Sequence, residues 1–352
     1  MRCAVLAVSP VGASLSRRVR DSLDGNADLY VNEKYAAAAP EGAKLYERLS
    51  GCVGELFHRY DALVFISAAG IAVRMIAPHL AGKLEDPAVL AMDEGGHYII
   101  SLLSGHVGGA NLLARQLAAS LGGEAVITTA TDVEGLIAPD GIASSLGLRP
   151  WPKERIEVFN SALLRGRRIC YYVEKSLPQA DFYLEKLAEY GVPVSMVEGE
   201  SFPKEGLRVC VTGEEQEGED VLCLLPRRLI AGIGCRAGTS EELVREALDS
   251  ACQRIGRDVS ALDLLASTVA KQGEPGLLAA AEHLGREIRF FGNERLQREI
   301  DAYDLRESAF VRSKIGVGNV CEAAALACVP KGRFALQKTK FEKVTVALVW
   351  ER

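Results

Sequence analysis

Short apolar runs alternate with amphipathic segments through the first part of the chain. The apolar runs Arg2–Val8, Ala62–Ser67 and Val89–Met92 are too short for buried helices and predict strands. The segments Ser14–Leu23 and Leu45–Tyr60 have apolar residues at helical spacing and predict helices. Strands that alternate with helices are typical of an α/β domain with a mainly parallel sheet, and we expect this fold class.

A strand followed by a glycine-rich turn is predicted between His97 and Asn111. The near-continuous apolar run His97–Leu103 predicts a strand that is covered on both faces. Residues 104–111, SGHVGGAN, form the turn, and an amphipathic helix that ends at Gly122 follows it. Because free amides and the helix dipole favour negative charge at a helix N-terminus, we expect this turn to bind an anion. The alternative is a tight connection that binds nothing.

Three polar turns follow predicted strands, at residues 67–74, 104–111 and 129–132. Ligands of parallel α/β sheets bind outside the carboxyl ends of the strands. If the three strands are parallel and adjacent, the turns line one edge of the sheet. The sequence therefore predicts one site that is built from these turns.

The remainder of the chain predicts two further α/β domains. Residues 133–226 contain helical and strand patterns, such as Lys153–Leu164 and Arg168–Glu174, but no chemical motif. A new domain begins near Leu229 with the strand LIAGIG, after which Thr239 and Glu242 have the spacing of a capping box. We expect an N-terminal domain over 1–132, a small middle domain over 133–226 and a C-terminal domain over 227–352.

Composition narrows the class of protein. A chain of 352 residues is long for one domain, and its 48% hydrophobic and 25% charged residues suffice for a core in each part. The net charge of −6 argues against a general nucleic-acid binder. Residues 227–352 are slightly basic, with 20 Lys and Arg against 17 Asp and Glu, which suits a small anionic substrate.

Cysteine use and hydropathy indicate the compartment. The nine cysteines form no C-x-x-C pair, and most lie in apolar runs, which is typical of a reduced protein. No apolar run reaches the length of a membrane span, and the apolar segment near the N-terminus is too short for a signal sequence. We expect a cytoplasmic protein that does not bind membranes.

The sequence does not match the common motifs for nucleotide binding, serine hydrolysis or metal binding. The glycines in Gly232-x-Gly234-x-x-x-Gly238 are one residue too widely spaced for a dinucleotide fingerprint, and no acidic strand end follows at the required distance. The sequence has neither a P-loop motif nor a G-x-S-x-G nucleophile elbow. The five histidines do not pair at metal-ligand spacing, so we expect no metal site.

The candidate catalytic residues lie in or beside the polar turns. His106 lies in the glycine turn, where an imidazole can transfer protons while neighbouring amides stabilise an oxyanion. Glu94 and Asp132 are candidates for acid–base work, although Asp132 could instead cap the next segment and Glu94 could be solvated. We expect His97, on an apolar strand, to be a packed histidine. Arginines and lysines near turns are candidates to pair with substrate carboxylates.

Several longer motifs together resemble the cobalt-precorrin-5A hydrolase family of anaerobic cobalamin biosynthesis, over nearly the whole chain. They are AAGIAVRMIAP (68–78), DPAVLAMDEGGHYIISLLSGHVGGANLLA (86–114), VITTATD (126–132), GIGCRAGTS (232–240), KQGEPGL (271–277), VGNVCEAAAL (317–326) and KVTVAL (343–348). The resemblance implies an enzyme that opens the ring-A δ-lactone of a cobalt-bearing, ring-contracted tetrapyrrole. It also implies that the carbon C20 leaves with its methyl group as acetaldehyde.

This resemblance implies how the candidate residues would be used. His106, Glu94 and Asp132 would be catalytic, and cobalt would arrive with the substrate, so that the protein needs no cofactor of its own. The expected corrinoid-binding residues are Gly70, Arg74, Lys83, Ser104, Gly105, Gly108, Gly109, Asn111, Thr129, Thr131, Arg236, Thr239, Lys271, Glu274 and Lys338. A large flat substrate suits a cleft between the outer domains.

Two other functions remain open at this point. One is a non-catalytic corrinoid-binding protein that passes intermediates, through transient contacts, to other enzymes of the cobalamin pathway. The other is a nucleotide-dependent oxidoreductase that uses GIGCRAG. The sequence does not indicate an oligomeric state.

Overall fold

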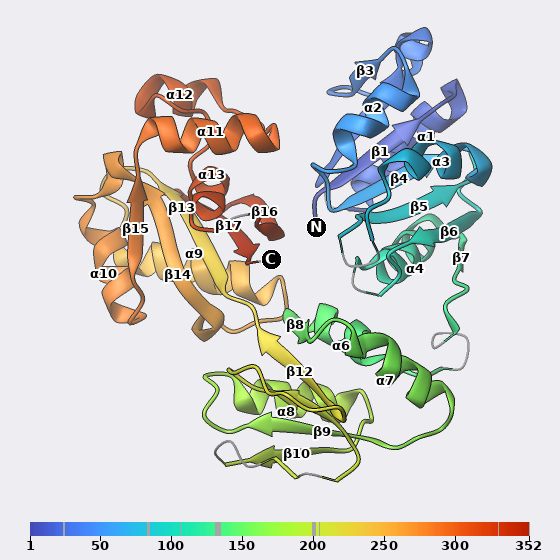
Figure 1. The fold of residues 1–352 in the computed structure, drawn as a ribbon. Helices are drawn as coiled ribbons and strands as arrows, with labels where there is room; N and C mark the ends of the chain where they lie inside the picture. Colours follow the sequence, from blue (N-terminus) through green and yellow to red (C-terminus); the bar gives the residue numbers. More distant parts are fainter. Residues whose placement is uncertain are drawn as a thin grey trace. The chain divides into compact units, whose positions relative to one another are not determined.

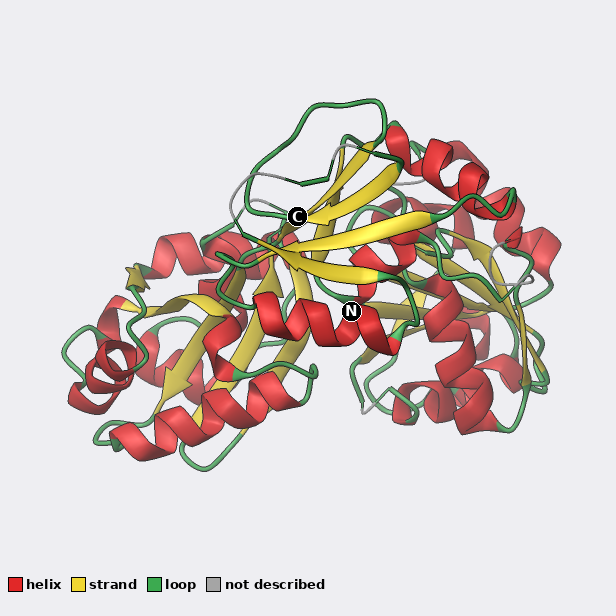
Figure 2. Ribbon diagram, turned by 90° about the horizontal axis from the view of Figure 1, so that it is seen from below, coloured by secondary structure: helices red, strands yellow, loops and turns green. Residues whose placement is uncertain are grey.

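The chain folds around three β-sheets, each packed with helices (Figure 1). The structure is a computed structural model that describes residues 1–23, 25–82, 85–106, 108–130, 135–198, 202–203, 205–329 and 331–351. Strands and helices alternate along the chain, which confirms the predicted α/β class. Figure 2 shows the helices lying beside the strands. Within these ranges, no helix combines the length and the hydropathy that crossing a bilayer requires.

Backbone contacts divide the chain into two units. One unit comprises residues 2–226 and contains the first two sheets, and the other comprises residues 227–352 together with Met1.

The first sheet has seven strands in the order β3-β2-β1-β4-β5-β6-β7. The strands are β1 Cys3–Ala7, β2 Ala27–Asn32, β3 Lys44–Tyr46, β4 Ala62–Ile66, β5 Ala88–Met92, β6 Tyr98–Leu103 and β7 Glu124–Val126. The helices are α1 Pro10–Asp21, α2 Leu49–Leu56, α3 Ala69–Ile76 and α4 Ala110–Leu121, with short 3₁₀ turns η1 Glu33–Ala38 and η2 Ala77–His79. Helices cover both faces of the central strands, and every residue of β1, β4 and β5 is therefore buried.

Strand direction changes within this sheet. Strands β1 to β5 are mutually parallel, but β6 pairs antiparallel with β5, and β7 runs parallel to β6. Helix α4 packs on β6 and β7, and of the β6 residues only Ile99 is fully buried. The prediction that this strand is covered on both faces is therefore wrong.

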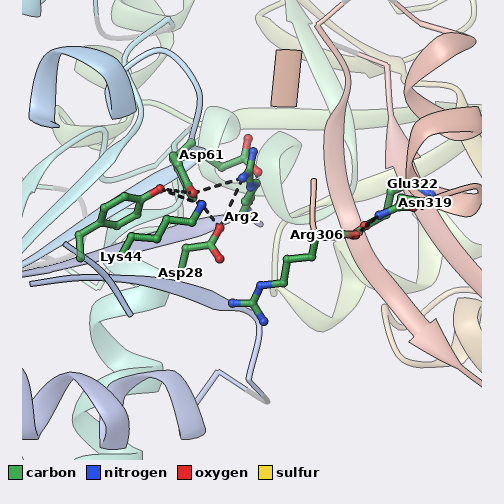
Figure 3. A network of polar contacts seen from close by, with 9 residues as sticks. Arg2, Asp28, Lys44, Asp61, Arg306, Asn319 and Glu322 are labelled. Atoms are coloured by element: carbon green, nitrogen blue, oxygen red, sulfur yellow. Dashed lines mark hydrogen bonds and ion pairs between the residues drawn. The ribbon is translucent and has the colours of Figure 1, made fainter. Parts of the chain in front are cut away.

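A polar network ties together the amino ends of β1, β2 and β4 (Figure 3). The backbone N–H of Arg2 donates to Asp61 Oδ2 at 2.7 Å, and the Arg2 guanidinium lies 3.4 Å from Asp28 Oδ2. The hydroxyl of Tyr60 donates to the same Asp28 oxygen at 2.7 Å. Because Arg2 and Asp28 are both buried and paired, we assign the network to holding these strand ends together.

The second sheet, in the middle of the chain, has the order β10-β9-β11-β12-β8. Its strands are β8 Leu148–Trp151, β9 Ile169–Glu174, β10 Val194–Val197, β11 Leu207–Val211 and β12 Val221–Pro226, and its helices are α6 Pro139–Ser145, α7 Arg155–Leu164 and α8 Ala180–Glu189. Residues from all three helices and from β8, β9, β11 and β12 share one apolar core.

The third sheet has the order β15-β14-β13-β17-β16. Its strands are β13 Leu229–Cys235, β14 Leu262–Thr268, β15 Ile288–Phe291, β16 Arg333–Lys340 and β17 Val344–Trp350. Its helices are α9 Glu241–Gln253, α10 Pro275–His283, α11 Asn293–Tyr303, α12 Ala309–Ile315 and α13 Cys321–Ala327, with 3₁₀ turns η3 Val259–Ala261 and η4 Val269–Lys271. Two separate apolar clusters, one with α9 and α10 and the other with α11 and α13, cover the two faces.

Two local predictions need correction. The helix predicted over Leu45–Tyr60 begins only at Leu49, because Lys44–Tyr46 instead pairs with β2 as the edge strand β3. The predicted capping box of Thr239 and Glu242 is wrong, because the helix is capped one residue later. Ser240 caps α9 and accepts a hydrogen bond from Leu243 N–H, whereas the Thr239 hydroxyl donates to the carbonyl of Arg236 at 2.8 Å.

Candidate functional site

The glycine-rich loop at residues 104–111 joins the carboxyl end of β6 to α4. Ser104 has a positive φ of 56°, and its hydroxyl donates to the Asp86 carbonyl at 3.0 Å. A Cβ on Gly105 would lie 2.7 Å from Asn111 Oδ1, and one on Gly108 would lie 2.4 Å from Ser104 Cβ. Both glycines are therefore required by the packing of the loop against itself.

The first amides of α4 are already hydrogen-bonded within the loop. Gly109 N–H donates to the carbonyl of His106 at 3.0 Å, Ala110 N–H to that of Ser104 at 3.2 Å, and Asn111 N–H to that of Gly105 at 3.1 Å. The expectation that free amides at this helix start hold an anion is wrong for these three groups, because the loop folds back and uses them itself.

Asn111 and Thr129 stabilise the same edge of the sheet. The buried Asn111 side chain accepts from Ser101 Oγ at 2.7 Å and donates to Thr129 Oγ1 at 3.1 Å. These bonds connect β6, α4 and the segment after β7. Both residues were predicted to bind substrate, and the structure gives each of them a partner within the protein.

His106 lies beside a buried carboxylate that the sequence analysis missed. Its Nδ1 is 3.5 Å from Asp140 Oδ2, and the two side chains are 16% and 1% exposed. The other Asp140 oxygen accepts from Asn160 Nδ2 at 3.0 Å. Asp140 lies in the first turn of α6 and Asn160 in α7. Nothing in the local sequence pattern distinguishes Asp140 from an ordinary acid at a helix start.

Glu94 lies far from His106, at the opposite edge of the sheet. Within the antiparallel pair, Met92 faces Ile99 and Val89 faces Leu103, so the 93–97 turn and the 104–111 loop are at opposite ends of β6. A strand of six residues separates them by about 17 Å. The turn at 67–74 follows β4 and shares the edge with Glu94, so the predicted single edge lined by all three turns is wrong.

An open pocket of about 640 Å³ lies at the Glu94 edge, between the ends of β4, β5 and β7. Glu94 lines it together with Asp93, Tyr98 and the apolar Ile100. Asp93 accepts from Tyr98 N–H at 2.7 Å and from Gly95 N–H at 3.0 Å; burial opposes its ionisation, but these bonds prevail and lower its pKa.

His97, Arg74 and Gly70, at the same edge, each have a partner within the protein. His97 pairs with Asp93 and its side chain is 75% exposed, so the prediction of a packed histidine is wrong. Arg74 donates to the carbonyl of Gly70 at 3.1 Å within α3. Gly70 and Arg74, both predicted to bind substrate, therefore contact each other, and they lie at the end of the sheet opposite to His106.

The predicted residues of the C-terminal unit gather at the carboxyl edge of β13 and β14. Lys271 Nζ donates to Glu274 Oε2 at 3.0 Å, each side chain is 11% exposed, and Glu274 also accepts from Gly238 N–H. The hydrogen bond from Lys271 lowers the pKa of Glu274. Arg236 is exposed, two residues before Gly238 in the chain.

Lys338 lies on β16 between Leu336 and Thr339, which the register through β17 places level with Ala231 and Ile233 in the middle of β13. Its backbone N–H donates to Glu322 Oε1 at 3.0 Å. Glu322 also pairs with the side chain of Asn319, and both residues are buried (Figure 3).

Lys83, Thr131 and Asp132 lie outside the described residues. Among the residues that are described, no three His, Cys, Asp or Glu side chains come together as a possible metal site.

Comparison with known proteins identifies the family. The family model for the N-terminal domain of cobalamin synthesis protein G matches residues 51–132, and the model for its C-terminus matches residues 229–349. The cobalt-precorrin-5A hydrolase of Salmonella typhimurium is 32% identical over 352 residues, which cover 98% of this chain and 96% of that protein. The enzyme of the same name from Priestia megaterium is 28% identical and covers 98% and 94%.

A solved structure supports the fold. The cobalamin biosynthesis protein G homologue of Sulfolobus solfataricus superposes with a TM-score of 0.64 at 21% identity, covering 100% of this chain and 97% of that one. With the full-length match to the Salmonella typhimurium protein, these similarities show that the chain belongs to the cobalt-precorrin-5A hydrolase family.

Proposed function

We propose that this protein is a hydrolase that converts cobalt-precorrin-5A and water to cobalt-precorrin-5B and acetaldehyde, with His106 as its general base. Family membership supports the substrate and the reaction. The observation that supports the site is the His106 imidazole, partly accessible at a sheet edge and within ion-pair distance of a carboxylate that is 1% exposed. A histidine held in this way is suited to accept and return a proton near neutral pH.

Lactone opening would use one water molecule. His106 removes a proton from the water as its oxygen attacks the lactone carbonyl, and the acyl C–O bond breaks. The imidazolium then returns the proton to the alkoxide on C20, which leaves a ring-A carboxylic acid and a free hydroxyl group. With Nδ1 directed at Asp140, the neutral ring carries its lone pair on Nε2, which is the atom that accepts the proton.

Acetaldehyde release would break a carbon–carbon bond. A base removes the proton of the new hydroxyl group, the oxygen forms the carbonyl of acetaldehyde, and the bond between C20 and the macrocycle breaks. The electron pair enters the conjugated macrocycle, which takes up a proton. Cobalt travels with the substrate, and the protein residues named here bind and transfer protons only.

The test is anaerobic incubation of the purified protein with cobalt-precorrin-5A while acetaldehyde is measured enzymatically. We expect turnover by the unaltered protein and at least a hundredfold loss in His106→Asn. His283→Asn is the matched control, because His283 is an exposed histidine of the C-terminal unit, and its activity should be unchanged. Full activity in His106→Asn would remove His106 from the mechanism. Binding of the corrinoid without any acetaldehyde would instead identify a non-catalytic carrier.

A further inference from the structure

The middle part of the chain lies outside both family models. These models match residues 51–132 and 229–349, which leaves α6, α7 and α8 and the second sheet without an assigned role. Nevertheless, α6 supplies Asp140, which lies next to His106, and α7 supplies Asn160, which donates a hydrogen bond to Asp140.

We infer that the middle domain contributes to the active site. Its Asp140, held by Asn160, orients the His106 imidazole. This inference rests on the proposed function and extends it to a positioning residue. Its basis is geometric: one carboxylate oxygen lies 3.5 Å from His106 Nδ1, and the other accepts from Asn160 Nδ2 at 3.0 Å.

The burial of Asp140 argues against an incidental surface contact. A carboxylate that is 1% exposed loses most of its hydration, and this cost is tolerated only when the charge has partners. The neighbouring Tyr171 is also buried, and burial together with the negative charge of Asp140 raises its pKa. A nearby imidazolium would be the natural counter-charge for Asp140 during proton transfer.

The core of the middle domain fixes the position of Asp140. Two residues after it, Ile142 is fully buried, and Ala143 and Leu146 pack in the same cluster as Phe159 of α7. Asn160 follows Phe159 directly, so its side chain is anchored by the same core. The carboxylate is therefore held by helices that pack in a buried core, whereas His106 lies on a loop.

The chemical consequence follows from the two ring nitrogens. A carboxylate at Nδ1 favours the tautomer that leaves Nε2 as the base, and it stabilises the imidazolium that forms when Nε2 takes a proton. Asp140 itself need not touch the substrate. Its removal should therefore lower kcat and leave substrate binding largely intact.

The test compares Asp140→Asn with the unaltered full-length protein. We expect kcat for acetaldehyde release to fall about 10²–10⁴-fold while KM changes less than about threefold. Asp181→Asn is the matched control, since Asp181 also lies in the first turn of a middle-domain helix, is exposed, and should leave kcat unchanged. Asn160→Ala should lower kcat about tenfold, because Asp140 would lose one hydrogen bond.

Chemical rescue separates orientation of the imidazole from support of the fold. In Asp140→Ala, added formate should restore at least a tenth of the lost kcat in a saturable manner, and neutral formamide should not. Formate should not rescue His106→Asn. If Asp140→Ala fails to fold, Asp140→Glu serves instead, with an intermediate kcat and an unchanged KM.

The outcomes distinguish this inference from the proposed function. Full activity in Asp140→Asn, alongside an inactive His106→Asn, would overturn the inference and leave the function intact. A loss in Asp140→Asn that is shared equally between kcat and 1/KM, together with no rescue of Asp140→Ala by formate, would show a purely structural role and overturn the inference. Absence of acetaldehyde from the unaltered protein would reject the proposed function itself.

Discussion

An ideal Cβ on Gly232 would lie 1.8 Å from the carbonyl oxygen of Cys321. Strand β13 and helix α13 therefore touch backbone to backbone in the C-terminal unit, and both residues adjacent to Gly232 on β13 are buried. This contact explains the first glycine of the GIGCRAG motif as a packing requirement. It needs no nucleotide, which removes one reason for the oxidoreductase interpretation.

Replacement of Gly232 should destabilise the C-terminal unit. In Gly232→Ala, the added methyl group would force α13 away from the sheet, and we expect the free energy of unfolding to fall by about 3 kcal/mol or more. Urea unfolding followed by circular dichroism measures the change. Gly273→Ala is the control, because a Cβ there meets no atom within 4 Å. Equal stability of the two variants would contradict the proposed packing.

Glu94→Gln should retain acetaldehyde release within about threefold of the unaltered rate. Glu94 is at the opposite edge of the sheet from His106, about 17 Å away, so it cannot share a proton with the imidazole. The same acetaldehyde assay, run beside His106→Asn, measures this. A loss as large as that of His106→Asn would instead locate a chemical step at the pocket lined by Glu94.

Stability of the C-terminal unit should depend on the ionisation of Glu274. Because the folded state lowers the pKa of Glu274 below its ordinary value of 4.5, its contribution is fully present above that pH and is lost as the pH falls further. Glu274→Gln should therefore cost about 1–2 kcal/mol at pH 7 and progressively less below pH 4.5.

Urea unfolding of both proteins across this pH range measures the difference. Glu282→Gln is the matched control, since Glu282 is exposed on the same helix and should show no such dependence. A cost of Glu274→Gln that stays constant down to pH 3 would argue against the Lys271–Glu274 bond as its source.

Ser240→Ala should remove the N-terminal cap of α9. The Ser240 hydroxyl accepts from Leu243 N–H, so its loss leaves one helix amide without a protein acceptor and should cost about 1 kcal/mol. Thermal or urea unfolding measures this cost. Ser250→Ala, inside the same helix, should be neutral or slightly stabilising. If the two variants unfold alike, the cap is absent in solution.

The sequence predicted best those elements that are buried along most of their length. β1, β4 and β5 were found because each consists of an apolar run that is buried throughout. The edge strands β3 and β10 were missed, as was β14, because short or mixed runs do not separate a strand from a loop. Helix α6 has only seven residues, which is too short for its apolar pattern to identify a helix. It was therefore missed, and Asp140 with it.

The sequence alone determined that this protein is built from α/β layers, that a glycine loop carries His106, and which family its motifs resemble. Tertiary structure alone decided that β6 reverses direction, which separates Glu94 from His106. It also decided that Asp140, 34 residues after His106, lies beside it. The physical reason is that hydrophobic periodicity reports which face of an element is buried, whereas strand direction and contacts between distant helices depend on how the buried faces pack.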